Sequence, residues 1–172
     1  DRGIIMMPDE KDRNPGQIDR VRGERGLARR SGFVARGVKQ LAQRAKDLLD
    51  GFFQEVMELY NVPAGRVILA GFSQGGAMTY RCGLGRPETF RGLVALSSVM
   101  PEPDELRPTL PTERTQPIFI AHGLHDDILP VDDGRRAREF LEAEGYAPDY
   151  REYPMRHEIT PDVMGDLVPW IK

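Results

Sequence analysis

Three residues whose side chains could cooperate in nucleophilic chemistry each follow a short apolar segment: Ser73, Asp126 and His157. In an open sheet of parallel strands, ligands bind beyond the carboxyl ends of the strands, so residues at these positions can meet. A serine hydroxyl needs a base poised near neutral pH, which histidine supplies. The histidine in turn needs a carboxylate that fixes its tautomer. We therefore expect Ser73 as nucleophile, His157 as base and Asp126 as orienting acid.

The segment around the serine predicts a sharp turn between a strand and a helix. An apolar run ending at Ala70 is followed by Gly71-Phe72-Ser73-Gln74-Gly75 and then by small residues that can begin a helix. This order is that of a nucleophile elbow, in which the serine has a strained backbone. A side chain at Gly71 or Gly75 is expected to collide with neighbouring elements. The backbone N–H of Gln74 is the expected donor to an oxyanion.

The rest of the chain supplies the elements that would position these residues. Apolar runs predict strands at 3–7, 66–71, 93–96, 117–121 and 150–153. Periodic apolar residues and helix-ending residues predict helices at 34–59, 75–84, 132–144 and 160–170. Residues 8–32 show no period and are expected to form a loop. Strands that are apolar on both faces and alternate with helices predict an α/β fold, a parallel sheet covered on both sides, in one domain spanning 1–172.

Composition excludes several classes of protein. The chain has 40% apolar and 30% charged residues, typical of a globular domain. It has no apolar run long enough to cross a membrane and no signal-peptide layout, so we expect a cytoplasmic protein. Its single cysteine, Cys82, falls in a predicted helix and is expected to be a core residue in a reducing compartment.

A basic segment raises the question of an anionic partner. Residues 11–46 carry eleven Lys or Arg residues against three acidic ones, although the net charge of the chain is −3. Such a segment could attract nucleic acid or an anionic membrane surface. Its only aromatic residue is Phe33, which leaves little to stack on bases. We therefore favour a solvated surface and expect no nucleic-acid partner.

The segment after the third internal strand contains two histidines and two aspartates that could suggest a metal site: His122, His125, Asp126 and Asp127. No pair among them has the spacing of zinc ligands on a helix, and Asp126 already has a role. We expect no metal and no organic cofactor. His122 is expected to be buried and structural, and His125 exposed. Asp127 is the rival of Asp126 for the orienting role.

Three motifs together resemble one family. They are Gly71-Phe72-Ser73-Gln74-Gly75-Gly76-Ala77-Met78, His122-Gly123-x-x-Asp126-x-x-x-Pro130, and Tyr153-Pro154-Met155-x-His157-Glu158-Ile159. From about residue 66 onward the chain resembles the phospholipase/carboxylesterase family of α/β-hydrolases, which includes the acyl-protein thioesterases. The resemblance implies cleavage of small-molecule carboxylic esters or thioesters through an acyl-serine intermediate, without a cofactor. It also points to Ser97 and Leu129 as residues that line the substrate site.

The chain departs from the family pattern in two places. Arg156 stands where the family usually has glycine before the catalytic histidine, which could reshape the loop or aim a positive charge at an acidic substrate. Residues 1–32 also lack the family's early strands and their His-Gly-x-Gly turn, the source of a second oxyanion donor. Segment 3–7 resembles a later family strand, and the strand expected between it and the elbow strand is missing, which would leave a gap in the sheet.

Two explanations of this departure stay open. The chain is either the C-terminal part of a longer one, or segment 3–7 moves into the gap as a right-handed βαβ unit. An exposed edge would favour pairing with another chain, which leaves a homo-oligomer as one option without deciding the oligomeric state. A related peptidase or dienelactone-type hydrolase, and a non-catalytic binding protein with this fold, are the alternative functions.

Overall fold

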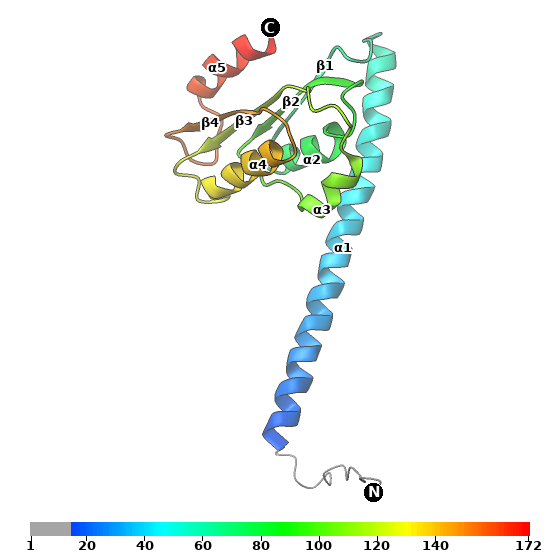
Figure 1. Ribbon diagram of the computed structural model, residues 1–172, viewed down its shortest axis with the longest axis vertical. Coiled ribbons are helices and arrows are strands. Elements are labelled where there is room, and N and C mark those ends of the chain that lie inside the picture. Colours follow the sequence, from blue (N-terminus) through cyan, green and yellow to red (C-terminus); the bar gives the residue numbers. More distant parts are fainter. Residues whose placement is uncertain (1–14) are drawn as a thin grey trace, which may run out of the picture. The chain divides into compact units, whose positions relative to one another are not determined.

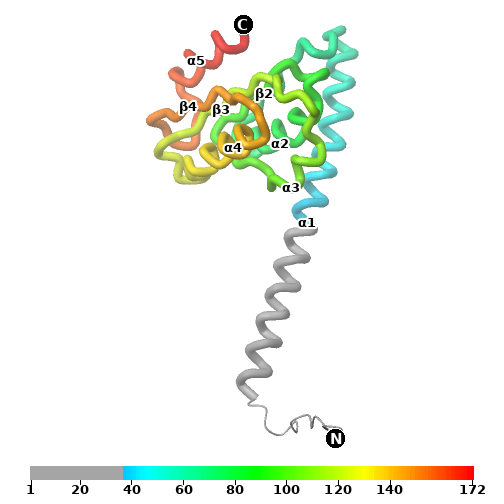
Figure 2. The backbone as a smooth tube through the Cα atoms, viewed as in Figure 1, coloured from blue at the N-terminus to red at the C-terminus, as the bar shows by residue number. Residues whose placement is uncertain are grey.

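The computed structural model describes the backbone of residues 15–172 (Figure 1). Side chains are described from residue 37 onward, the part of the backbone that is coloured in Figure 2. The chain divides into two units, Asp1–Ala45 and Lys46–Lys172. The strand expected at 3–7 lies outside the described residues. The assignment of the whole chain to one domain stays a prediction, and all the elements around the candidate site belong to the second unit.

A four-stranded parallel sheet forms the centre of the Lys46–Lys172 unit. Its strands are β1 (Val67–Phe72), β2 (Phe90–Leu96), β3 (Ile118–Gly123) and β4 (Asp149–Tyr153). They lie in the order β1-β2-β3-β4, and every neighbouring pair is parallel. The connections carry α2 (Gln74–Gly83), α3 (Pro103–Leu106) with the short 3-10 helix η2 (Arg107–Thr109), and α4 (Val131–Ala143), and α5 (Pro161–Ile171) follows β4. The four strands expected between residues 66 and 153, and the helices expected after three of them, are confirmed.

Helices cover both faces of the sheet, which confirms the expected α/β architecture (Figure 1). Along β2, Leu93 and Ala95 belong to a core cluster shared with α2 and α4. Their neighbours Val94 and Leu96 belong to a second cluster shared with α5. Successive side chains of a strand point to opposite faces, so a strand buried on both faces has no polar side.

Helix α1 (Pro15–Leu59) is longer than the sequence predicted. The prediction of a loop at 8–32 is wrong from Pro15 onward, where the chain is helical. Residues 8–14 lie outside the described part. Between Pro15 and Pro63 the chain has no proline, Pro15 suits a first helical position, and this stretch is rich in Arg, Gln, Glu, Ala and Leu, which favour helix. The prediction relied on apolar periodicity, which a polar helix does not show.

The last turns of α1 pack on the sheet through a residue outside the apolar period. Phe53 packs edge-on against Phe90 of β2, with 5.4 Å between the ring centroids. The periodic residues Leu48, Phe52 and Leu59 are instead exposed. The period therefore identified the helix but only part of the face that packs, since its member Val56 is half-buried.

β1 is the edge of the described sheet. It pairs with β2 on one side, and within residues 15–172 no strand pairs with its other side. A hollow of about 470 Å³ lies between this strand and the end of α1, lined mainly by apolar residues that include Phe53, Val56 and Leu69. The gap expected between segment 3–7 and the elbow strand stays a prediction. Among the helices described here, none is long and apolar enough to cross a membrane.

Candidate active site

Ser73 is the single residue between the end of β1 and the start of α2, on the turn that the sequence predicted. Its φ of 54° and ψ of −120° lie in a strained region for a residue with a side chain. A Cβ atom on Gly71 would lie 2.2 Å from the carbonyl carbon and oxygen of Gly75. Only glycine at position 71 therefore lets the helix start so close to the strand.

The prediction of a collision at Gly75 is wrong. The position that has no room for a side chain is its neighbour Gly76. A Cβ atom on Gly75, an exposed residue, would meet no atom of the described residues within 4 Å. A Cβ atom on Gly76 would lie 2.5 Å from the Cβ and Oγ atoms of Ser98, which is buried after β2. The second constraint on the turn thus comes from the end of the neighbouring strand.

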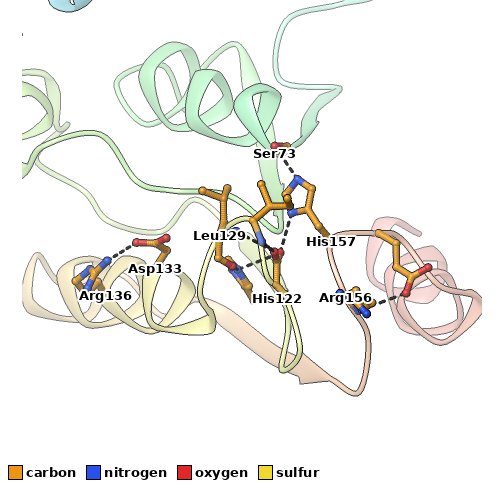
Figure 3. A network of polar contacts seen from close by, with 10 residues as sticks. Ser73, His122, Leu129, Asp133, Arg136, Arg156 and His157 are labelled. Carbon is orange, nitrogen blue, oxygen red and sulfur yellow. Dashed lines mark hydrogen bonds and ion pairs between the residues drawn. The ribbon is translucent and has the colours of Figure 1, made fainter.

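His157 lies between the serine and an aspartate, in the loop between β4 and α5 (Figure 3). Its Nε2 atom is 2.9 Å from Ser73 Oγ, and its Nδ1 atom is 2.7 Å from Asp126 Oδ2. A carboxylate only accepts, so Nδ1 carries the hydrogen and Nε2 is left to accept from the serine hydroxyl. The Phe72 ring lies 4.8 Å from the imidazole, tilted by 42°. The structure thus brings all three residues of the expected triad into one line of contacts.

Asp126 is held as a carboxylate by the loop that follows β3. The backbone N–H groups of Ile128 and Leu129 both donate to its Oδ1 atom over 2.9 Å. Burial by itself raises the pKa of Asp126, but hydrogen bonds from the Leu129 amide, His157 and the Ile128 amide outweigh it and lower that pKa below 3.8. The group that faces His157 is therefore ionised at neutral pH.

Asp127, the rival acid, points to a different partner. It forms an ion pair with Arg156, in which both side chains are largely exposed. The hydrogen bond from Arg156 lowers the pKa of Asp127. The positive charge expected to reshape the loop or to face a substrate therefore lies against an aspartate. This pair links the two loops that carry Asp126 and His157.

The two remaining histidines lie where the sequence predicted. His122 is fully buried at the end of β3, and its Nε2 atom is 2.9 Å from the carbonyl oxygen of Leu129. His125 is exposed. Within the described part of the chain, no group of three or more His, Cys, Asp or Glu side chains could hold a metal ion.

The other predicted site residues stand at the same edge of the sheet. Gln74 is the first residue of α2, where backbone N–H groups have no acceptor within the helix. Ser97 follows β2 with a φ of 42° and is fully buried, and its Oγ atom has no hydrogen-bond partner among the residues described. Leu129 is half-buried and contributes its backbone to the contacts around Asp126. A role of these three residues toward substrate stays a prediction.

Sequence reasoning did not single out Phe72 or the backbone of Leu129 as parts of this arrangement. Phe72 fills a variable position of the Gly-x-Ser-x-Gly pattern, and its only signal is an aromatic residue directly before the serine. Leu129 was expected to line the substrate site, whereas the contacts described above come from its backbone N–H and C=O groups. Backbone roles of this kind carry no signal in residue type.

Comparisons with known proteins agree with this geometry. The sequence pattern of the phospholipase/carboxylesterase family matches residues 28–172. An acyl-protein thioesterase 1 of Mycosarcoma maydis is 33% identical over 120 residues, which are 66% of this chain and 50% of that protein. A probable carboxylesterase of Oryza sativa subsp. japonica is 28% identical over 138 residues, or 79% of this chain and 50% of that protein.

A solved structure is similar over about three quarters of this chain. The crystal structure of Arabidopsis thaliana SOBER1 superposes with a TM-score of 0.67 and 26% identity, covering 76% of this chain and 62% of that one. The chain spans about half the length of the two curated relatives named above. The matched region contains the parallel sheet, the elbow at Ser73 and the loops that carry Asp126 and His157. The chain therefore belongs to the phospholipase/carboxylesterase family of α/β-hydrolase-fold proteins.

Proposed function

We propose that this chain is a serine hydrolase that cleaves carboxylic esters or thioesters through an acyl-serine intermediate. The observation that carries the proposal is the line of contacts from Ser73 Oγ through His157 to Asp126, with distances of 2.9 and 2.7 Å. Nucleophile, base and orienting acid need these separations and this order. The names of the relatives, thioesterase and carboxylesterase, support the same substrate class.

Each of the three residues has a defined role in the proposed reaction. Ser73 Oγ attacks the acyl carbon while its proton passes to His157 Nε2, and the negative charge of Asp126 stabilises the imidazolium that forms. The tetrahedral intermediate collapses and expels the alcohol or thiol, which takes the proton from His157. Water then attacks the acyl-serine while His157 takes its proton. Ser73 Oγ leaves, takes this proton from His157, and the acid is released.

The oxyanion of the tetrahedral intermediate would be stabilised at the start of α2. The Gln74 N–H lies directly after the nucleophile, and the positive end of the helix dipole favours a developing negative charge there. The resemblance places a second donor on a His-Gly-x-Gly turn. The only histidine of this chain that precedes a glycine is His122, in the loop of the orienting acid.

The proposal is tested with a small aryl ester, an acyl thioester and a fluorophosphonate probe. We expect the chain to turn over the esters, to be labelled at one serine, and to lose both properties in Ser73→Ala. Thr112→Ala, which truncates an exposed hydroxyl outside the site, is the control and should behave like the parent chain. Equal labelling of parent and Ser73→Ala would contradict the proposal.

Two further outcomes decide between the alternatives. A folded chain that neither turns over esters nor reacts with the probe would favour a binding protein that retains the triad without catalysis. Turnover of peptide or lactone substrates with no action on esters or thioesters would favour a related peptidase or dienelactone-type hydrolase.

A further inference from the structure

His122 is a fully buried histidine behind Asp126 with no role in the proposed reaction steps. It is the fifth residue of β3 and lies on the face from which Ile118 and Ile120 join the core cluster beneath α4. Burying a polar ring among apolar neighbours is unfavourable unless the ring is hydrogen-bonded. Its contacts therefore indicate what it does.

Within the part of the chain that the structure describes, the imidazole has one hydrogen-bond partner, the carbonyl oxygen of Leu129, 2.9 Å from Nε2 (Figure 3). A carbonyl oxygen only accepts, so Nε2 carries the hydrogen and donates it. The same Nε2 atom lies 3.6 Å from Asp126 Oδ2, which is too long for a hydrogen bond but close enough for the N–H dipole to favour the carboxylate. His122 thus contacts the Asp126 loop at two points.

Leu129 joins His122 to the proposed triad through its backbone. Its N–H donates to Asp126 Oδ1 over 2.9 Å, while its C=O accepts from His122. The other oxygen of Asp126 accepts from His157 Nδ1. A displacement of the Leu129 peptide would therefore move the carboxylate that orients the base.

The His122 ring is also held from the side of α4. A Cβ atom on Gly134 would lie 2.8 Å from Nδ1 and 3.0 Å from the Cβ atom of His122. The helix backbone thus approaches the ring so closely that a side chain at position 134 would displace the ring. Nδ1 is buried and has no hydrogen-bond partner among the described residues, so within this part of the chain Nε2 makes the ring's only hydrogen bond.

We infer that His122 is a positioning residue for the proposed serine hydrolase, which holds the Leu129 peptide and through it sets Asp126, and thereby His157, in the productive orientation. The inference rests on the proposed function of the same site. It assigns His122 no contact with substrate. The loss of its Nε2 donor should therefore lower kcat and leave KM unchanged.

The first test compares two substitutions at His122 with a matched control. His122→Leu removes the donor but keeps an apolar body, and we expect kcat to fall roughly tenfold to a hundredfold, as a misplacement within an active site does. His122→Gln keeps an N–H at a similar reach and should restore most of the loss. His125→Leu makes the same change at an exposed histidine of the same loop and should leave kcat unaltered.

A second variant disturbs the ring without removing it. Gly134→Ala places a methyl group against the imidazole within helix α4, where alanine has the higher helix propensity. We expect kcat to fall while the chain stays folded. Gly165→Ala in α5, where a Cβ atom would meet nothing within 4 Å, is its control and should match the parent chain. This pair keeps the test decisive if His122→Leu fails to fold.

A double-mutant cycle separates positioning from a general structural role. If His122 acts through Asp126, then His122→Leu should cost little further kcat in an Asp126→Asn background. Equal losses of kcat in both backgrounds, or a folded His122→Gln variant as impaired as His122→Leu, would overturn the inference.

A spectroscopic measurement distinguishes this inference from the proposed function. The proton in the bond between His157 Nδ1 and Asp126 gives a downfield NMR resonance that can be observed without turnover. His122→Leu should shift or broaden this resonance, and His125→Leu should not. An inactive parent chain that shows this response would refute the proposed hydrolase but retain the positioning contact. An unchanged resonance would refute the contact itself.

Discussion

Asp126 Oδ2 lies 2.7 Å from His157 Nδ1, although the two residues belong to loops that follow different strands. β3 and β4 are parallel neighbours, so both loops leave the sheet at the same edge. The exposed ion pair between Asp127 and Arg156 joins the same two loops beside this contact. The adjacent aspartates therefore have separate partners, and a substitution at each should have a distinct effect.

Asp126→Asn should lower kcat roughly 10³- to 10⁴-fold, because an amide favours the wrong histidine tautomer and cannot stabilise the imidazolium. Asp127→Asn is the matched control, since it makes the same chemical change one residue away. We expect it to retain most of the activity. Steady-state kinetics with an aryl ester measures both variants. Comparable losses at the two positions would contradict the assignment of Asp126.

The turn at Ser73 leads to different predictions for Gly71 and Gly75, although both are glycines of the Gly-x-Ser-x-Gly motif. Gly71→Ala would place Cβ 2.2 Å from the backbone of Gly75, so we expect a loss of about 3 kcal/mol or more in unfolding free energy. Gly75→Ala enters open space at the start of α2 and should change that free energy by less than about 1 kcal/mol. Urea unfolding followed by circular dichroism measures both. Equal destabilisation would show that the packing around the turn differs from that described.

The line of contacts at the site could be expected from the sequence because it depends on chain order and strand direction. Ser73, Asp126 and His157 each follow a parallel strand, and parallel strands bring such residues to one edge. Apolar runs and helical periods were enough to locate the strands and helices that carry them. The proximity of these three side chains follows from that topology.

Features that depend on packing between distant segments could not be predicted in this way. The tight contact at Gly76 requires Ser98 from the next strand, and the ion pair of Arg156 requires Asp127 from another loop. The helix that begins at Pro15 was missed for a different reason, since Arg, Gln and Glu favour helix without leaving an apolar period. Apolar periodicity indicates which residues of an element share a face. It does not indicate which residues of other elements that face contacts.

The lowered pKa of Asp126 makes stability depend on pH in a defined direction. The pKa of Asp126 in the folded chain lies below 3.8, the ordinary value of an aspartate. The contribution of this carboxylate to the unfolding free energy is therefore complete above that ordinary value and is lost as the pH falls through the lower pKa of the folded chain. We expect the unfolding free energy of the parent chain to decrease more steeply than that of Asp126→Asn between about pH 5 and about pH 2. Urea titrations across this range test the difference in slope. Parallel pH profiles would show that Asp126 is not stabilised as a carboxylate in the folded chain.

Cys82 offers a last test, which reports on the core rather than on the site. The residue is buried in α2, and burial, followed by the nearby charge of Asp50, raises the pKa of its thiol to about 11. The thiolate is the reactive form, so an aromatic disulfide reagent at about pH 8 should react very slowly with the native chain. Unfolding in guanidinium should release one thiol per chain, because the sequence contains a single cysteine. Rapid reaction of the native protein would show that α2, which begins directly after Ser73, opens readily from the sheet.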